Sequence, residues 1–131
     1  MTTALTVLFL CQHNAGRSQL GAHLLNHVAG DRFTATSAGI TPAAEVNPAV
    51  AASLAELGID TSDARPRAVT ADDLDTVGVV IAMKPGLNLP GAVAGEYIEW
   101  EFPDPAGWDA DGIRPLRDAV AQRLESLIAR E

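Results

Sequence analysis

The chain has 131 residues, 47% of them hydrophobic and 20% charged, as expected for one globular domain, residues 1–131, that can bury a core. The net charge of -8 argues against nucleic-acid binding, because a phosphate backbone repels an acidic chain. The single cysteine excludes an internal disulfide, and the sequence has neither a signal-peptide pattern nor a run long enough to span a membrane. We therefore expect a cytoplasmic monomer.

Strand-like apolar runs alternate with segments of helical spacing along the chain. The start signals of two helices are clear: Asn47 with Pro48 forms an N-cap and first residue, and Thr70 is followed by Asp73. In chain order the patterns predict a strand at 4–10, a helix at 18–29, a strand at 33–38, a helix from 48 to Gly58, a short helix from 70, strands at 77–83 and 95–100, and a helix at 113–130. The apolar face of the first helix would comprise Leu20, Leu24, Leu25 and Val28.

This order of elements predicts an α/β fold. The sheet would have four strands, mostly parallel, with helical crossovers and with helices on both faces. Ligands of such sheets bind outside the carboxyl ends of the strands. Cys11 directly follows the first predicted strand, so it is expected at this edge.

The segment from Cys11 to Ser18 has the layout of an oxyanion-binding loop between a strand and a helix. Backbone N–H groups and a helix N-terminus bind anions, and the guanidinium of Arg17 can contact two oxygens at once. Gly16 allows a close backbone approach, and Asn14 tolerates a left-handed conformation. The loop residues expected to surround the anion are Gln12, His13, Asn14, Ala15, Gly16 and Arg17.

Cys11 is the candidate nucleophile of this loop. A helix N-terminus and a nearby guanidinium favour the thiolate form, and Ser18 can donate a hydrogen bond to it. The alternative is a small buried hydrophobic cysteine with Arg17 in solvent. The combination of a cysteine, an arginine six positions later and a serine at a strand-to-helix turn favours the nucleophile.

A second candidate segment is residues 100–107, which follow the last predicted strand. Pro103 and Pro105 flank Asp104, so this carboxylate is held in a stiff loop. Placed at the same edge as Cys11, it can act as a general acid on a leaving oxygen. A plain turn is the alternative.

Taken together, these segments resemble the low-molecular-weight tyrosine phosphatase fold, and within it the arsenate reductases. The resemblance covers nearly the whole chain. Its motifs are VLFLCQHNAGRSQ at 7–19, SAG at 37–39, NP at 47–48, GID at 58–60, DPAG at 104–107 and IRPLRD at 113–118. Phosphatases of this fold usually carry an aromatic residue after the Asp-Pro pair, where this chain has Ala106.

The resemblance implies a role for each matched residue. Cys11 would attack arsenate, with phosphate as a competitor, while Arg17 and the loop amides hold the oxyanion. Ser18 would stabilise the thiolate, and Asp104 would protonate the departing oxygen. Asn14 and Ser37 would form the network that supports the loop.

The resemblance also implies where the electrons come from. Thioredoxin-coupled members carry two more cysteines after the third strand, but residues 83–90 of this chain contain none. An external thiol must therefore attack the Cys11–arsenate adduct, and single-cysteine members use mycothiol with mycoredoxin. Glutathione with glutaredoxin is the other candidate pair. No tightly bound cofactor is expected.

Other readings of the same residues stay open. Phosphomonoester hydrolysis through a phospho-cysteine is the main alternative function, and a non-catalytic oxyanion sensor is another. His23 and His27 have a spacing that suits zinc, but without a third ligand we predict no metal site. The position of a potassium-binding glutamate in several reductases corresponds to Ala22. His13 either lines the pocket or faces solvent, and Trp108 either shields the site or anchors its loop.

Overall fold

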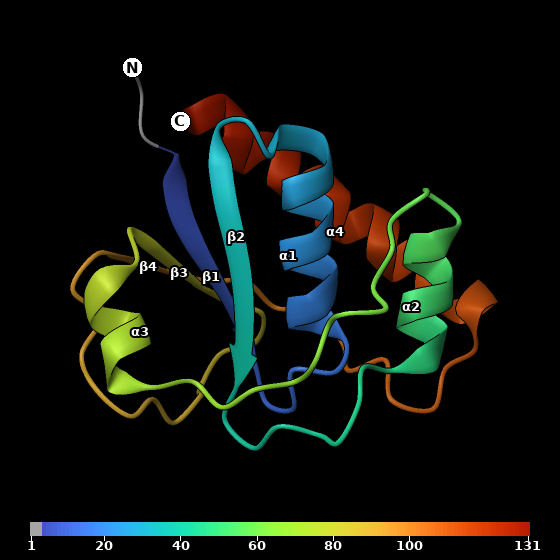
Figure 1. Cartoon of the computed structure of the whole chain (residues 1–131), viewed down its shortest axis with the longest axis horizontal. Helices are drawn as coiled ribbons and strands as arrows, with labels where there is room; N and C mark the ends of the chain where they lie inside the picture. Colours follow the sequence, from blue (N-terminus) through green and yellow to red (C-terminus); the bar gives the residue numbers. More distant parts are fainter. Residues whose placement is uncertain (1–3) are drawn as a thin grey trace.

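The computed structural model describes residues 4–131 and contains one four-stranded sheet. Its strands are β1 (Leu5–Cys11), β2 (Phe33–Gly39), β3 (Val79–Ala82) and β4 (Glu96–Glu99), in the order β2-β1-β3-β4. Every neighbouring pair is parallel, so the predicted sheet is confirmed. The carboxyl ends of the strands meet at one edge, at the bottom of Figure 1.

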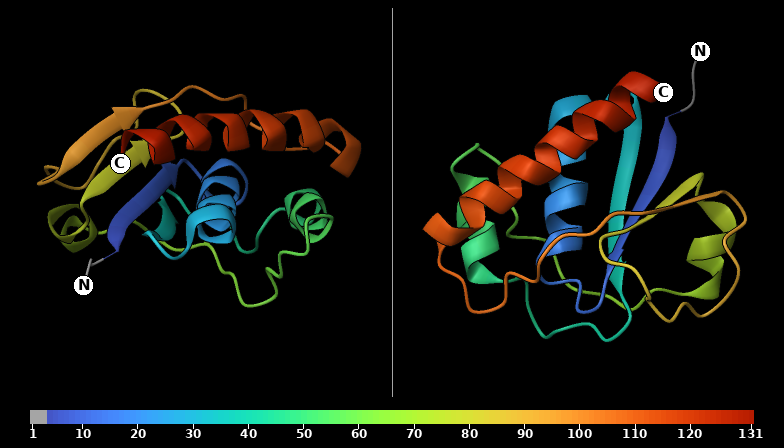
Figure 2. Two further views of the ribbon diagram at one scale, coloured as in Figure 1. Left: turned by 90° about the horizontal axis from the view of Figure 1, so that it is seen from above. Right: turned by 180° about the vertical axis from the view of Figure 1, so that it is seen from behind.

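Four helices cover the sheet, and both of its faces are covered as predicted. They are α1 (Arg17–Ala29), α2 (Pro48–Ala55), α3 (Ala71–Thr76) and α4 (Ala110–Arg130). Figure 2 shows α1, α2 and α4 on one side of the sheet and α3 on the other. The alternation of β1 divides the core accordingly: Phe9 packs in the cluster of the three helices, and Leu8 in the cluster of α3.

Local capping explains where the helices begin. The Asn47 side chain accepts a hydrogen bond from the Ala49 N–H, with Pro48 at the first helical position, as the sequence predicts. Thr70 and Asp73 form a reciprocal capping box at α3. The final helix starts three residues before the predicted Ile113, because the Asp109 carboxylate caps it by accepting from the Gly112 N–H.

One expectation about the fold is wrong. Val28 lies on the exposed side of α1, with 59% of its surface accessible. The buried face of this helix therefore excludes one of the four apolar residues predicted to form it. The connection from β3 to β4 contains no helix among the described residues, in agreement with the predicted succession of strands at 77–83 and 95–100. Residues 83–95 run over the α3 side of the sheet, where the Ala94 N–H donates to the Leu74 carbonyl and three apolar side chains join the α3 cluster, namely Leu87, Leu89 and Val93.

Within residues 4–131, no helix combines the length and the apolar character that crossing a membrane requires.

Candidate active site

Cys11 is the last residue of β1, and the Cys11 loop (residues 11–17) connects β1 to α1. The Cys11 side chain is only 2% exposed. Asn14 is the one non-glycine residue with positive φ among those described, at 52°, which confirms the left-handed turn expected there. The turn reverses the chain tightly enough to bring the start of α1 back beside Cys11.

The carbonyl groups of the Cys11 loop all point away from its centre into hydrogen bonds. Backbone N–H groups of residues 40, 41, 43 and 47 donate to the carbonyls of residues 11, 12, 13 and 15, at 2.8–3.3 Å. The Gln19 side chain donates to the Asn14 carbonyl at 2.9 Å, and the Leu20 N–H donates to Gly16. The segment after β2 therefore fixes the outer side of the loop.

The amide groups of the same loop have no such partners. Among residues 4–131, none accepts a hydrogen bond from the backbone N–H groups of residues 12–17. Consecutive free N–H groups at a helix N-terminus form a concave anion-binding site. The loop therefore presents a series of unpaired donors at the end of the strand that carries Cys11.

A chain of hydrogen bonds supports Cys11 from inside. The Cys11 Sγ and Ser18 Oγ atoms are 2.9 Å apart, and the Asn14 Nδ2 donates to the same Ser18 oxygen at 2.8 Å. Because the amide nitrogen is only a donor, Ser18 accepts from Asn14 and is left to donate its proton toward Sγ. This geometry stabilises negative charge on the sulfur.

The partner of Asn14 on its other side was not predicted. The Asn14 Oδ1 accepts a hydrogen bond of 2.9 Å from the backbone N–H of Arg67, 53 residues further along the chain. Ser37, which the resemblance placed in this network, makes no side-chain hydrogen bond to Asn14 or Ser18 among the described residues. It lies opposite Phe9 in β2, and the backbone of Arg67 takes the supporting place instead.

Arg17 is turned into the same space and is only 7% exposed. Its Nη1 donates to the Phe102 carbonyl at 3.0 Å, so the guanidinium is fixed by the segment after β4. The Cys11 cavity has a volume of about 200 Å³, below the roughly 300–1,000 Å³ of pockets for drug-sized ligands. Its lining consists of Cys11, His13, Ala15, Gly16, Arg17, Ala43, Asn47, Asp104, Pro105 and Ala106.

The Asp104 loop (residues 100–107) closes one side of this cavity, so Asp104 and Cys11 do share one site. The Asp104 carboxylate accepts from the Ala106 N–H at 3.1 Å, which orients it within the turn. A Cβ atom added at Gly16 would lie 2.8 Å from Pro105 Cγ. Glycine at position 16 therefore allows the close contact between the Cys11 loop and the Asp104 loop.

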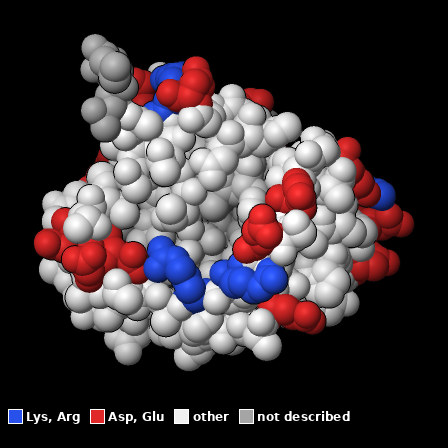
Figure 3. Space-filling view, in the orientation of Figure 1, with Lys and Arg blue, Asp and Glu red and all other residues white. Residues whose placement is uncertain are grey.

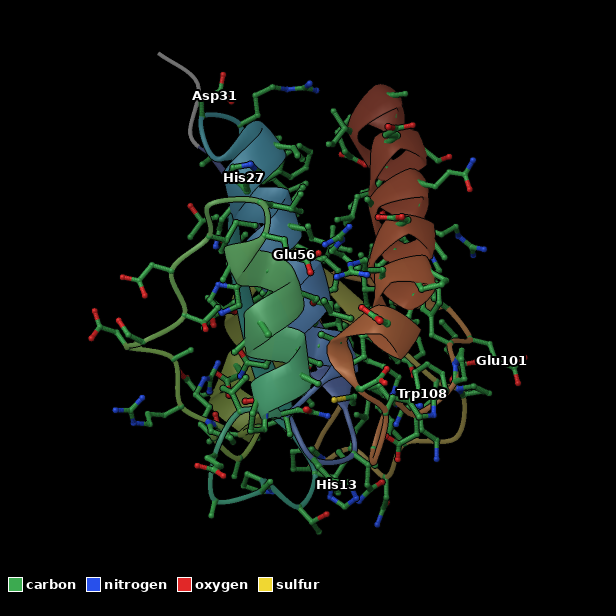
Figure 4. The ribbon with its side chains drawn as sticks, turned by 90° about the vertical axis from the view of Figure 1, so that its right-hand side faces the viewer. His13, His27, Asp31, Glu56, Glu101 and Trp108 are labelled. Atoms are coloured by element: carbon green, nitrogen blue, oxygen red, sulfur yellow. The ribbon has the colours of Figure 1, made fainter. Side chains whose placement is uncertain are left out.

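His13 and Trp108 lie at the same end of the molecule as the cavity, while His27 lies at the far end of α1 (Figure 4). His13 lines the cavity and its Nδ1 contacts the Thr41 carbonyl at 3.1 Å, whereas Trp108 is not among the lining residues. The Gln12 side chain points outward, donating to Thr41 Oγ1 at 3.1 Å. Gln12 contributes to the site through its backbone.

Burial lowers the pKa of His23, and its Nε2 lies 3.1 Å from the Gln19 side-chain oxygen. The same Gln19 donates to the Asn14 carbonyl. Among the described residues, His23 and His27 do not join a group of three possible metal ligands. Ala22, on the same helix, is buried. His23 therefore has a structural partner in this fold.

A cluster of charges fastens α2 to α4 behind the cavity wall. Glu56, labelled in Figure 4, accepts from Arg114 at 2.7 Å and from Arg117 at 2.8 Å, and Arg117 also donates to the Ser53 carbonyl. Hydrogen bonds from Arg114 and then Arg117 lower the pKa of Glu56 from 4.5 to about 2. The cluster holds α2, whose N-cap Asn47 lines the Cys11 cavity.

On the face shown in Figure 3, the charges of the surface are mixed. Figure 3 shows a few basic side chains between acidic groups on this face, and the chain as a whole carries a charge of -8. Attraction of an oxyanion therefore depends on the backbone amides and Arg17 inside the cavity.

Comparison with known proteins agrees with this site. The model of the low molecular weight phosphotyrosine protein phosphatase family matches residues 6–89, and the chain belongs to this family. Within it, the chain groups with the arsenate reductases. The glutaredoxin arsenate reductase of Synechocystis is 31% identical over 127 residues, covering 95% of this chain and 96% of that protein.

Solved structures show the same relationship. A thioredoxin-dependent arsenate reductase from Corynebacterium glutamicum is 36% identical with a TM-score of 0.82, and the match covers 97% of this chain but only 61% of that longer chain. A tyrosine phosphatase from T. tengcongensis has the same TM-score of 0.82 at 22% identity, covering 98% of this chain and all of that one. The second likeness concerns the fold alone.

Proposed function

We propose that this protein reduces arsenate to arsenite through a Cys11–arsenate adduct that an external thiol attacks. One observation carries the proposal: a single buried cysteine, hydrogen-bonded to Ser18, lies beside the free amides of residues 12–17 in a cavity of about 200 Å³. This space suits a small tetrahedral oxyanion. The kinship with arsenate reductases points to the same substrate.

In the first step the Cys11 sulfur forms a bond to arsenic, and an As–OH oxygen leaves with its electron pair. A proton from Asp104 converts that oxygen to water. Arg17 and the loop amides hold the remaining oxygens. The stiff turn around Asp104 and the closeness of Pro105 to Gly16 support this assignment, because they place the acid beside the loop that binds the anion.

In the second step the sulfur of an external thiol bonds to arsenic with loss of its proton, and the As–Sγ electron pair returns to Cys11, where Ser18 stabilises it. A second thiol then attacks the sulfur now bound to arsenic. The electron pair of that S–As bond stays on arsenic, giving arsenite, and a disulfide forms between the two external sulfurs. Cys11 is not oxidised in this route, which therefore works with the single cysteine of the chain.

We infer that the thiol is mycothiol and that mycoredoxin completes the reduction in the cytoplasm. The absence of any second cysteine supports an external relay. The names of the relatives give two further possibilities to test, glutaredoxin with glutathione and thioredoxin.

The test is arsenate-dependent NADPH oxidation with three separate reducing systems: mycothiol with mycoredoxin and its reductase, glutathione with glutaredoxin and its reductase, and thioredoxin with its reductase. We expect turnover with the first system, abolished by Cys11→Ser and kept by His27→Gln. Turnover with only one of the other two systems would identify the thiol of that system as the reductant. No turnover with any system, together with Cys11-dependent hydrolysis of p-nitrophenyl phosphate, would replace the reductase by a phosphatase.

A further inference from the structure

The hydrogen-bond partners of the His13 ring assign it one tautomer. Its Nδ1 lies 3.1 Å from the Thr41 carbonyl and 3.3 Å from Thr41 Oγ1. The carbonyl can only accept, and the Thr41 hydroxyl already donates to the Gln12 carbonyl while it accepts from the Gln12 amide. Nδ1 must therefore carry the proton in neutral His13, which leaves a lone pair on Nε2.

That lone pair belongs to an exposed residue at the edge of the Cys11 cavity. Among residues 4–131, none donates a hydrogen bond to Nε2 of His13, and the residue lines the same cavity as Cys11 and Asp104. Four lining residues carry groups that can ionise, namely Cys11, His13, Arg17 and Asp104. In the first step Cys11 is the nucleophile, Arg17 the fixed cation and Asp104 the proton donor. His13 is the one of these four residues without a role in that step.

The second step needs a group of this kind. An ordinary thiol is mostly protonated at neutral pH, yet only the thiolate attacks. A thiolate approaching the anionic arsenic group and the Asp104 carboxylate would be repelled by both. A neutral base at the cavity lets the thiol arrive uncharged and becomes a cation when the new bond forms.

We propose that His13 is the proton acceptor for the external thiol, an inference that rests on the proposed function. The S–H proton passes to Nε2 while the sulfur bonds to arsenic and the As–Sγ electron pair returns to Cys11. The imidazolium then gives its proton to water. The Thr41 carbonyl keeps the ring in the required tautomer throughout.

The test compares wild type, His13→Gln and His27→Gln with two thiols, 2-mercaptoethanol and the more acidic trifluoroethanethiol, in arsenate reduction. Glutamine can still donate to the Thr41 carbonyl but cannot take a proton from a thiol. We expect His13→Gln to lose about 100-fold of its turnover with 2-mercaptoethanol. With trifluoroethanethiol the loss should be severalfold at most, because that thiol is already largely ionised.

Two controls separate this role from a structural one. Arsenate-protected alkylation of Cys11 by iodoacetamide and the melting temperature should be the same in wild type and His13→Gln, and His27→Gln should match wild type with both thiols. An equal loss with the two thiols, or no loss with either, would overturn the inference and leave the reductase intact. If wild type shows no turnover with either thiol, both the proposed reductase function and the role of His13 are overturned.

Discussion

Two segments follow neighbouring parallel strands at the same edge of the sheet, yet only one builds a site. After β1, the carbonyls of the Cys11 loop are bonded outward, and the N–H groups of residues 12–17 have no acceptor among the described residues. After β3, residues 83–95 cover α3 with apolar side chains, and none of them lines the Cys11 cavity. Position at the carboxyl edge of a sheet is thus not enough to form a binding site. The backbone amides of the loop must also be left free to bind a ligand.

The contrast also divides the proposed reaction. The loop after β1 holds the nucleophile and the anion, while the segment after β3 contains no thiol to pass electrons on. The protein would supply the groups for forming the Cys11–arsenate adduct itself. The thiols that attack the adduct and reduce the arsenic would come from outside. Substitutions in the two segments should therefore differ sharply in effect.

The largest expected effect is at Arg17. Arg17→Lys keeps a positive charge but loses the two-pronged guanidinium and its bond to the Phe102 carbonyl. We expect kcat/KM for arsenate to fall by about 10²–10³-fold, the loss typical of one missing oxyanion donor. Steady-state kinetics would measure it. A lysine variant within a few-fold of wild type would show that charge alone suffices.

The next effect concerns Asn14, which is fully buried and has left-handed backbone geometry. Asn14→Ala leaves the Arg67 N–H and Ser18 without their partner and strains the turn, so unfolding free energy should fall by about 2–4 kcal/mol. Asn14→Gly removes the same bonds without the strain and should recover about 1 kcal/mol of it. Urea denaturation would compare the two. Equal stability of both variants would contradict the role of strain.

A smaller effect is expected from Glu56, because its pKa is about 2 in the folded protein and 4.5 otherwise. The ionised carboxylate favours the folded state above about pH 5, and this contribution disappears as the pH falls toward 2. Glu56→Gln should therefore lose less stability than wild type between pH 7 and pH 3. Urea midpoints at both pH values test this, with the exposed Glu125→Gln as control. Parallel losses in wild type and Glu56→Gln would refute it.

The smallest effect is expected at Asn88, the asparagine of the segment after β3. Asn88 is exposed and makes no side-chain hydrogen bond to any described residue. Asn88→Ala should keep arsenate turnover within about twofold of wild type, equivalent to about 0.5 kcal/mol. A large loss of turnover would show that the segment after β3 contributes to the active site, as the Cys11 loop does.

The parts that sequence could predict are those set by local patterns. The strand before Cys11, the caps at Asn47 and Thr70 and the left-handed turn at Asn14 each follow from neighbouring residues. The meeting of Cys11 with Asp104 followed from the parallel sheet, because both come after strands that end at one edge.

The parts that escaped prediction depend on distant backbone atoms. The donor to Asn14 is a main-chain N–H, which every residue but proline possesses, so nothing in the sequence marks Arg67 for that role. The course of the link between β3 and β4 over the α3 side of the sheet escaped for a related reason. Its apolar residues complete the α3 cluster, and a pattern of residues does not tell which face they will cover.

The contact between Gly16 and Pro105 limits how this enzyme can change. Gly16 and Pro105 lie so close that a single added carbon would collide, although 89 positions separate them in the chain. The loop of the nucleophile and the loop of the acid therefore form a matched pair. A chimera that took either loop from a relative would disturb the other, so the two have to be inherited, or grafted, together.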